Sequence, residues 1–408
     1  MTTHDMPPAS ILAVTSEVPW PLTSGGRLRT YHLLRQLAQV HRVTLVVPIA
    51  GAAATAGDAL RAAGIDLRVV ACGMGGPVRQ GTAALSALLR SEPYVMYRRH
   101  RHQAVARALP RVASDVAADV LYFDHLDGFA YPDVPGTAVV GDLHNVYSML
   151  LARTAAEERR PIWRPYLARE ARLLARAEAA AANRARLLFS VSAQEQRHFA
   201  ALGSARVEIV PNGVDCAAYA NLPVGRRGAP VVMFLGALSW APNATAAEFL
   251  AHDVLPQLRT HVPGVVLRIV GRDPGPRILR LADDPAIDIA GSVPDVMPYL
   301  RESTVLAVPL GAGGGTRLKI LEAFAAGIPV VSTPIGCEGI DAVDGEHLVV
   351  AELPEFTEAI ARVLREPERA ARMAAAARRL VEQHYDWTAI GRRAARAIAE
   401  IVPAPRVS

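Results

Sequence analysis

Short runs of β-branched and other apolar residues recur along the chain and alternate with longer segments of helical period. This alternation is typical of parallel sheets whose strands are joined by helices. The first half predicts strands at 10–15, 42–49, 66–72, 119–124, 137–143, 186–192 and 207–211. The second half predicts strands at 230–236, 265–271, 287–293, 304–310, 328–333 and 347–351. We therefore expect two α/β halves, each built on a parallel sheet.

The helical pattern and the turn residues divide the chain further. An Ala/Arg/Glu-rich stretch at 147–183 predicts one long helix, and 354–402 is purely helical. The segment 213–230 is rich in turn residues and lacks periodicity, so it is expected to be a linker. We expect one domain at 1–212, a second at 231–384, and a terminal helix at 385–408 that crosses back to the first. Ligands of such sheets bind outside the carboxyl ends of the strands, so we expect the catalytic and binding residues in the loops there.

Composition excludes several classes of protein. The 408 residues suit two domains, and a hydrophobic share of 51% is enough for two cores. The first residues lack the pattern of a signal peptide, and no apolar run is long enough to span a membrane. Three widely spaced cysteines suit a reducing compartment and give no metal-binding spacing. We expect a cytoplasmic protein without a metal, and a net charge of +5 does not indicate nucleic-acid binding.

Only one of the 44 basic side chains, Lys319, is a lysine. Arginine serves wherever a general positive charge is enough, so a lone lysine suggests a site that needs a compact ammonium group. The alternative is that this lysine has no special role.

The segment 309–331 has the strongest chemical pattern. A strand is followed by small residues from Gly311 to Thr316, and a helix then begins with Arg317, Lys319 and Glu322. Glycines let a ligand approach the backbone, and the start of a helix attracts phosphate. The two cations suit a diphosphate, whereas a carboxylate one turn later suits sugar hydroxyls. The alternative is a glycine turn with an ordinary helical ion pair.

This segment, GGGTRLKILEAFAAGIPVVST, resembles the donor site of glycosyltransferase family 4. Other pieces match that family in order: PLTSGGRLRTYHLLRQL, SVSAQE, VPNGVD, FLGALSWAPNATAAEFL, LRIVG, IDIAGSVPDVMPYL and YDWT. The resemblance implies the GT-B fold, with two Rossmann-like parallel-sheet domains and a cleft between them. It also implies a retaining transfer that uses a nucleoside diphosphate sugar as co-substrate and no other cofactor.

The resemblance also implies roles for individual residues. Glu322 is similar to the glutamate that binds the donor ribose, and Gly236 begins a loop that faces the phosphates. The glycines Gly313, Gly314 and Gly315 resemble the loop that contacts the sugar and diphosphate. Ser292 and Val293 resemble the positions that hold the base through backbone atoms.

Two departures from the family pattern affect these roles. Gly314 stands where the family usually has a first glutamate, and Ala237 to Asn243 lack the usual Arg and Lys. We therefore expect Arg317 and Lys319 to neutralise the leaving diphosphate.

The first half offers two further candidates for the active site. Gly25 and Gly26 follow the first strand and precede a helix expected at 27–39, so this turn is a second place for close approach of a ligand. His144 ends a strand, with Asp142 two residues earlier, and is a candidate catalytic group on the acceptor side. His125 is the rival, and a structural histidine is the alternative to both.

Several charged and aromatic residues have a plainer interpretation. The basic segment from Arg98 to Arg111 is a candidate for peripheral contact with the inner membrane face, and the alternative is a solvated helix. We interpret Glu195 as helix surface and Trp163, Trp240 and Trp387 as packing residues.

The sequence thus predicts an enzyme that moves a hexose from a nucleoside diphosphate sugar, UDP-linked by expectation, to a hydroxyl acceptor of unknown identity. Two alternatives stay open: a sugar-nucleotide epimerase of the same fold and a sugar-nucleotide-binding protein without activity.

Overall fold

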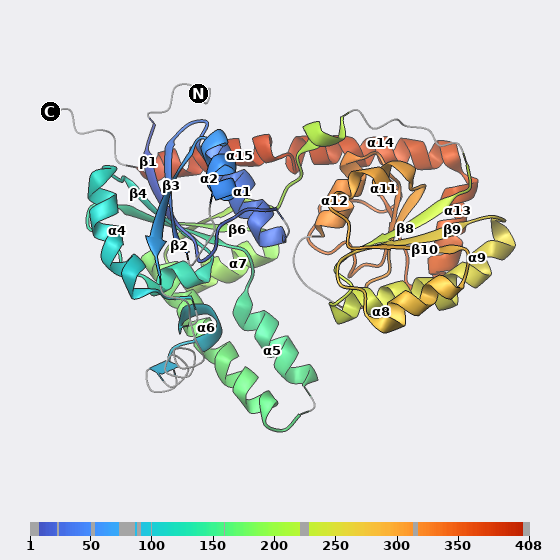
Figure 1. The fold of residues 1–408 in the computed structure, drawn as a ribbon, viewed down its shortest axis with the longest axis horizontal. Helices are drawn as coiled ribbons and strands as arrows, with labels where there is room; N and C mark the ends of the chain where they lie inside the picture. The colour runs from blue at the N-terminus through green and yellow to red at the C-terminus, as the bar shows by residue number, and fades with distance from the viewer. Residues whose placement is uncertain are drawn as a thin grey trace. The chain divides into compact units, whose positions relative to one another are not determined.

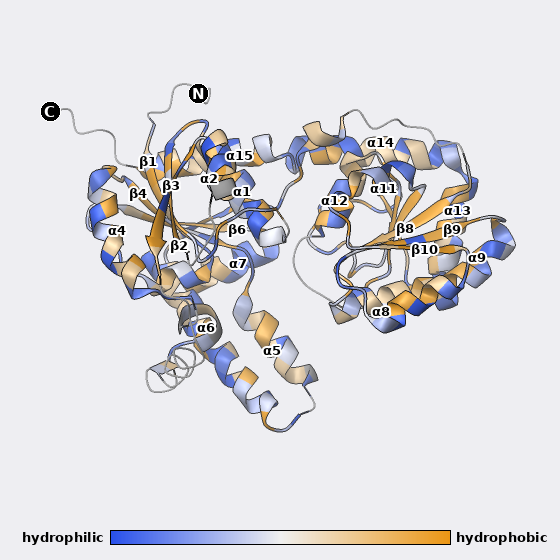
Figure 2. Cartoon of the chain, viewed as in Figure 1, coloured by the Kyte–Doolittle hydropathy of each residue, from blue (hydrophilic) through white to orange (hydrophobic). Residues whose placement is uncertain are grey.

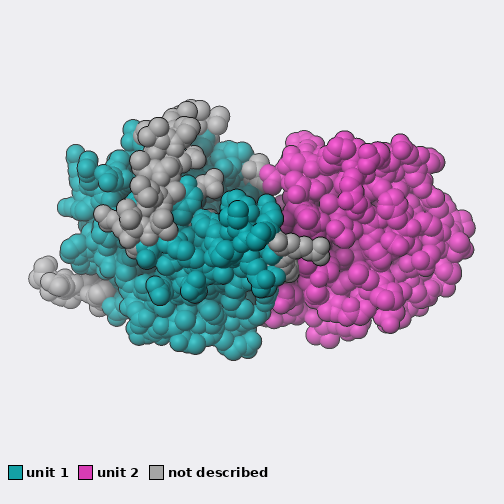
Figure 3. Space-filling model, turned by 90° about the horizontal axis from the view of Figure 1, so that it is seen from below, with its two compact units in different colours: residues 1–211, 390–408 teal, residues 212–389 magenta. Residues whose placement is uncertain are grey.

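The chain divides into two compact units, Met1–Pro211 with Ile390–Ser408, and Asn212–Ala389 (Figure 3). The computed structural model describes residues 8–22, 24–49, 54–72, 86–87, 91–98, 100–158, 160–220, 228–312 and 317–402. Within these ranges, every helix is too short or too polar to cross a bilayer.

The first unit is built on a seven-stranded parallel sheet in the order β3-β2-β1-β4-β5-β6-β7 (Figure 1). Its strands are β1 Ser10–Val14, β2 Arg42–Ile49, β3 Ile65–Ala71, β4 Val120–Asp124, β5 Ala138–Leu143, β6 Leu187–Ser190 and β7 Arg206–Ile209. Each overlaps a segment that the sequence predicts to be a strand, and β3 and β7 begin one residue earlier than predicted. The central strands β1 and β4 are buried along their whole length, as their continuous apolar runs require.

Helices connect these strands. They are α1 Gly25–Leu37, α2 Ala54–Ala62, α4 Gln103–Asp115, α5 Tyr147–Glu157, α6 Trp163–Arg184 and α7 Ala193–Leu202. The prediction of one helix at 147–183 is wrong, because α5 ends before Pro161 and α6 begins after it. A proline removes a backbone donor and restricts the residue before it, which ends a helix. The two helices pack against each other as a hairpin that extends from the rest of this unit.

The second unit is built on a six-stranded parallel sheet in the order β10-β9-β8-β11-β12-β13. Its strands are β8 Val231–Leu235, β9 Val266–Val270, β10 Ile287–Gly291, β11 Val305–Val308, β12 Val330–Ser332 and β13 Val349–Val350, again as predicted. Its helices are α8 Ala241–Phe249, α9 Leu255–His261, α10 Pro276–Leu279, α11 Met297–Glu302, α12 Leu318–Ala325, α13 Phe356–Arg365 and α14 Pro367–His384.

The last helix, α15 Trp387–Ile401, packs on the first unit from Ile390 onward. The carbonyl oxygen of Ala395 lies 3.4 Å from His41 Nε2, and Arg206 forms an ion pair with Glu400. A side chain at Gly391 would collide with Gln36, since its Cβ would lie 2.2 Å from the Cβ of Gln36. This helix can therefore approach α1 closely only with a glycine at that position.

Each unit has its own apolar core, centred on its sheet (Figure 2). Leu12, Leu121 and Phe123 are buried in the first, and Phe234 and Phe324 in the second. Since all paired strands are parallel, their carboxyl ends lie at one edge of each sheet, and the loops there carry the candidate sites.

Candidate active site

Four charged side chains meet at the carboxyl edge of the first sheet. β4 ends at Asp124, which lies opposite Asp142 in β5, and His144 follows two residues later. Helix α1 contributes Arg29. We call Arg29, Asp124, Asp142 and His144 the buried quartet, because each is less than 7% exposed.

Short hydrogen bonds connect the members of the quartet. Arg29 donates to Asp142 from Nε at 3.0 Å and from Nη2 at 2.5 Å. His144 Nε2 lies 3.1 Å from an oxygen of Asp124 and 3.2 Å from an oxygen of Asp142. The hydroxyls of Thr15 and Thr30 donate to the other oxygen of Asp124 at 2.8 and 2.9 Å. The two cations neutralise the two anions, because a buried charge is stable only when it is paired and hydrogen-bonded.

The quartet keeps His144 protonated. Burial lowers the pKa of His144, but the carboxylates of Asp142 and Asp124 outweigh burial and raise it to about 9. Burial likewise opposes ionisation of Asp142, yet Arg29 and His144 hold its pKa well below its usual range. His144 is therefore an imidazolium at neutral pH and cannot accept a proton there. Its predicted part in acceptor chemistry stays a prediction, and the geometry adds a positioning role.

The raised pKa of His144 should appear in the pH dependence of stability. Its folded-state pKa of about 9 exceeds the unfolded value of 6.5, so the stabilisation is complete below pH 6.5 and is lost as pH rises through 9. We expect the difference in unfolding free energy between wild type and His144→Gln to shrink by about 3 kcal/mol from pH 6 to pH 10. Urea unfolding of both proteins across this range is the measurement. A difference independent of pH would show that His144 is neutral when folded.

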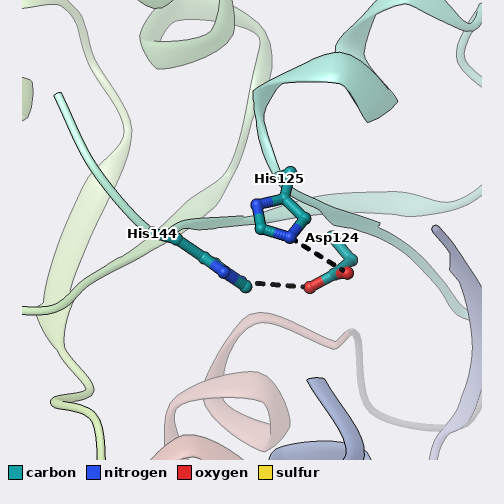
Figure 4. Close-up of side chains that lie close together, drawn as sticks. All are labelled: Asp124, His125 and His144. Carbon is teal, nitrogen blue, oxygen red and sulfur yellow. Dashed lines mark hydrogen bonds and ion pairs between the residues drawn. The ribbon is translucent and has the colours of Figure 1, made fainter. Parts of the chain in front are cut away.

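His125 lies beside His144 and Asp124 at this edge (Figure 4) and is the more exposed of the two histidines. Its ring packs on that of His144 with centroids 3.6 Å apart, and its side chain is 20% exposed. Burial and the charge of His144 lower the pKa of His125, which favours the neutral form. Its backbone has φ 67° and ψ 166°, a region that is sparsely populated for any residue but glycine. Such strain is concentrated at functional sites, so it supports His125 as a candidate for contact with substrate.

The predicted glycine turn lies beside His125. Gly25 and Gly26 form the first turn of α1, which begins two residues earlier than predicted, and the Oγ of Ser24 accepts the backbone N–H of Arg27. A Cβ at Gly26 would lie 3.6 Å from the His125 ring. The turn is thus adjacent to the quartet, as the ends of neighbouring strands require.

Asp124, His125 and His144 could also bind a metal, because one ligand atom from each lies within 4.8 Å of the others. A metal would have to remove the proton from His144 and compete for oxygens that Thr15 and Thr30 already contact. The Arg29 cation beside Asp142 opposes a second positive charge. The donor set therefore fits an ion-pair network better than a metal site.

The sequence interpretation missed two residues of this edge. The sequence pattern did not single out Arg29 in the first helix as a site residue, and it led to the interpretation of Glu195 as helix surface. Glu195 caps α7, accepting the backbone N–H of Val191 at 3.2 Å, while Ser192 Oγ accepts the N–H of Glu195. Burial raises the pKa of Glu195 to about 7. The spacing S-x-x-E, which predicts a capping box, was the available signal.

In the second unit, Lys319 reaches back from α12 to the end of β8. Its Nζ donates to Asn243 Oδ1 at 3.0 Å and lies 4.7 Å from the centre of the Phe234 ring. A Cβ at Gly236 would lie 2.8 Å from Nζ, so a side chain there would displace the ends of Lys319 and Asn243. Burial, and then the charge of Arg317, lower the pKa of Lys319 to about 7.

Glu322 and Arg317 differ in what they contact. Burial raises the pKa of Glu322 to about 7, and no hydrogen bond joins its carboxylate to another described side chain. It is therefore available to a ligand. Arg317 is buried, and its Nη2 donates to the carbonyl of Ile335 at 3.2 Å, which holds the loop after β12.

The remaining predicted positions lie after β9 and β10 or outside the described residues. A Cβ at Gly271 would lie 1.7 Å from the carbonyl oxygen of Gly236, so two strand ends touch through backbone alone. Ser292 is exposed, and its Oγ accepts the N–H of Asp273 at 3.3 Å, whereas Val293 packs on the core. Gly313, Gly314 and Gly315 lie outside the described residues.

Comparisons with known proteins agree with this arrangement. The family model described as "Glycosyltransferase Family 4" matches residues 52–218, and that described as "Glycosyl transferases group 1" matches residues 229–366. Together they cover about three quarters of the chain.

Two curated relatives come from Mycolicibacterium smegmatis. A phosphatidyl-myo-inositol mannosyltransferase is 32% identical over 201 residues, covering 47% of this chain and 50% of the relative. A GDP-mannose-dependent alpha-(1-6)-phosphatidylinositol monomannoside mannosyltransferase is 30% identical over 217 residues, covering 47% and 56%. The chain thus spans about half the length of the curated relatives it matches.

Solved structures share the fold. HepE of Anabaena, crystallised with UDP and glucose, superposes with a TM-score of 0.66 at 17% identity, covering 96% of this chain and 99% of HepE. WaaG, a glycosyltransferase involved in lipopolysaccharide biosynthesis, gives 0.63 at 15%, covering 97% and 100%. With both halves matched and two parallel-sheet units of the GT-B type, this chain belongs to glycosyltransferase family 4.

Proposed function

We propose that the chain transfers a hexose from a nucleoside diphosphate sugar to a hydroxyl acceptor in the cytoplasm. The observation that carries this proposal is the arrangement in the second unit. There Lys319 and the backbone at Gly236 and Gly271 come together at the ends of parallel strands, and Glu322 interacts with Lys319 from one turn later on α12. A diphosphate needs a compact cation and a backbone that it can approach, and the ribose needs a carboxylate with a free lone pair.

Lys319 is proposed to act on the leaving diphosphate. In the structure described here, Nζ is held by one neutral acceptor, Asn243, and by the face of Phe234. Neither contact neutralises the ammonium, so a phosphate oxygen gains more from it than it would from a lysine already paired with a carboxylate. Stabilisation of charge that develops on the leaving group is a large term in transfer reactions.

His125 is proposed to contact the transferred sugar or the acceptor. It is neutral, partly exposed and placed next to Gly26, while His144 behind it is fixed by two carboxylates. The quartet then serves to hold His125 in position, so the order of importance for the two histidines is reversed relative to the sequence expectation.

An assay with both kinds of donor identifies the base, because the sequence analysis expects UDP whereas the name of one relative contains GDP-mannose. We expect the full chain to release UDP or GDP from a set of UDP-hexoses and GDP-mannose, faster when an acceptor hydroxyl is added. Glu322→Gln should raise the KM for the donor at least ~10-fold, since it replaces one of the two carboxyl oxygens by an amide that cannot accept a hydrogen bond. His125→Ala should instead lower kcat.

Mass spectrometry of the products separates transfer from its alternatives. A product heavier than the acceptor by one hexose supports the proposal. Conversion of the donor to another sugar nucleotide would make the chain an epimerase, and tight binding without turnover on every acceptor would make it a binding protein. Glu358→Gln, at an exposed carboxylate of the same unit, is the control and should leave KM unchanged.

A further inference from the structure

The hairpin of α5 and α6 exposes large apolar side chains at its far end. Ile162 is 82% exposed and Trp163 49%, and both lie at the start of α6, next to the turn. Leu150, in the first turn of α5, is 44% exposed. Figure 1 shows this end extending from the first unit, away from its sheet. An exposed Ile next to an exposed Trp is costly in water unless something covers them.

A shallow groove of about 600 Å³ runs between the two helices behind this end. Most of its lining side chains are small: Ala152, Ala155, Ala156, Ala168, Ala171 and Ala175. Arg164 and Arg172 also line it. The groove thus combines an apolar lining with two cations.

The hairpin also concentrates positive charge. Residues 147–176 contain seven arginines and three glutamates, in a chain whose net charge is +5. Of those glutamates, Glu170 is buried, accepts from the backbone of Tyr94 and pairs with Arg169, and Glu158 pairs with Arg160. The guanidinium of Arg160 also lies 5.6 Å from the Trp163 ring. Among the described residues near this end, the exposed charged side chains Arg153, Arg160 and Arg164 are all basic, and one carboxylate, Glu158, pairs with one of them.

We propose that the α5–α6 hairpin docks on an anionic phospholipid bilayer, with Ile162 and Trp163 at the level of the headgroups. Tryptophan prefers the membrane interface, and arginines extend their apolar stems along such a surface while their guanidinium groups reach lipid phosphates. The alanine groove takes the apolar part of a lipid, and the two arginines that line it take the headgroup. A second copy of this basic chain would bring like charges together, so complementarity favours the anionic membrane.

The basic segment expected to contact a membrane is less suited to it. The exposed positions of α4 include Arg107 and Arg111, with Asp115 4.0 Å from Arg111. Among its described residues none is an exposed large apolar side chain. That segment lacks the apolar element that the hairpin has.

Vesicle flotation with the full chain tests the proposal. We expect the protein to float with vesicles of phosphatidylcholine and phosphatidylglycerol at 7:3, and to stay at the bottom with phosphatidylcholine alone or in 0.5 M NaCl. Ile162→Ser/Trp163→Ser should weaken binding to the anionic vesicles at least ~10-fold. The control is Leu279→Ser/Val343→Ser, which removes two apolar side chains of the second unit that are each more than half exposed and should bind like wild type.

A second pair of variants tests the charge. Arg153→Ser/Arg164→Ser should weaken binding, and Arg372→Ser, at an exposed arginine of α14, should not. The proposal is overturned if a hairpin variant and its control lose the same amount of vesicle binding, or if the hairpin variants bind like wild type. It is also overturned if light scattering shows that the hairpin variants change dimerisation instead. Sugar transfer to a water-soluble acceptor should be unchanged in all four variants, so the outcome is independent of the proposed function.

Discussion

Replacing Lys319 with arginine is expected to lower the rate of sugar transfer by about 10²-fold, while the melting temperature changes by only a few degrees. Loss of one contact to a developing anion costs about 3 kcal/mol of transition-state stabilisation. Nζ occupies a space bounded by Asn243, Phe234 and the bare backbone of Gly236. A planar guanidinium is too large for that space and turns outward, where it misses the leaving oxygen.

Single-turnover kinetics and calorimetry on the same preparation measure both quantities. Lys319→Met, which keeps the length and removes the charge, should lose as much activity as the arginine variant. Arg301→Lys, an exposed position of the same unit, should change neither quantity. Wild-type turnover in Lys319→Arg would mean that the lone lysine has no special role.

Asp142→Asn is expected to destabilise the protein by about 3–5 kcal/mol, because it leaves the buried Arg29 cation without its carboxylate. For a unit of this size, such a loss lowers the melting temperature by about 10 °C. Asp66→Asn is the matched control: Asp66 pairs with Arg68 at the surface of the same unit, and both are more than half exposed. The control should cost less than about 1 kcal/mol.

Urea unfolding of the two variants provides the comparison. The double variant Arg29→Met/Asp142→Leu removes both charges and should recover much of the stability lost by Asp142→Asn alone. A cost near that of Asp66→Asn would show that water reaches the quartet and screens it.

The strands of both units could be predicted from sequence because each is a short apolar run bounded by turn residues. In both units helices alternate with parallel strands, so the order of elements also indicated that the candidate sites lie at the carboxyl ends of the strands. The break at Pro161 was misread because the alanine- and arginine-rich composition on both sides favours helix. A local proline signal was there, but the average composition over the segment outweighed it.

The site was only partly predictable, for a physical reason. Lys319 and Glu322 lie three residues apart on one helix, so their proximity follows from the sequence. Arg29 and Asp142 are 113 residues apart, and only the strand order brings them together. Exposure also depends on tertiary structure: Trp387 packs as interpreted, whereas Trp163 and Trp240 are exposed, at 49% and 41%.

The single lysine gives this chain a built-in reporter. Reductive methylation with ¹³C-formaldehyde modifies amines and leaves guanidinium groups unchanged, so the labelled protein carries one side-chain signal, from Lys319, and one from the amino terminus. A pKa near 7 makes the ε-amine reactive at neutral pH, and the methyl shift follows its titration directly. A dimethylated Nζ is still a titratable amine, and any ligand that brings phosphate to Asn243 and Gly236 would move that resonance. Because the two methyl groups enlarge Nζ in a confined space, the donor affinity of the labelled protein is compared with that of the unlabelled one. Donor binding could thus be observed at one atom, in an unmodified sequence, without assignment of any other signal.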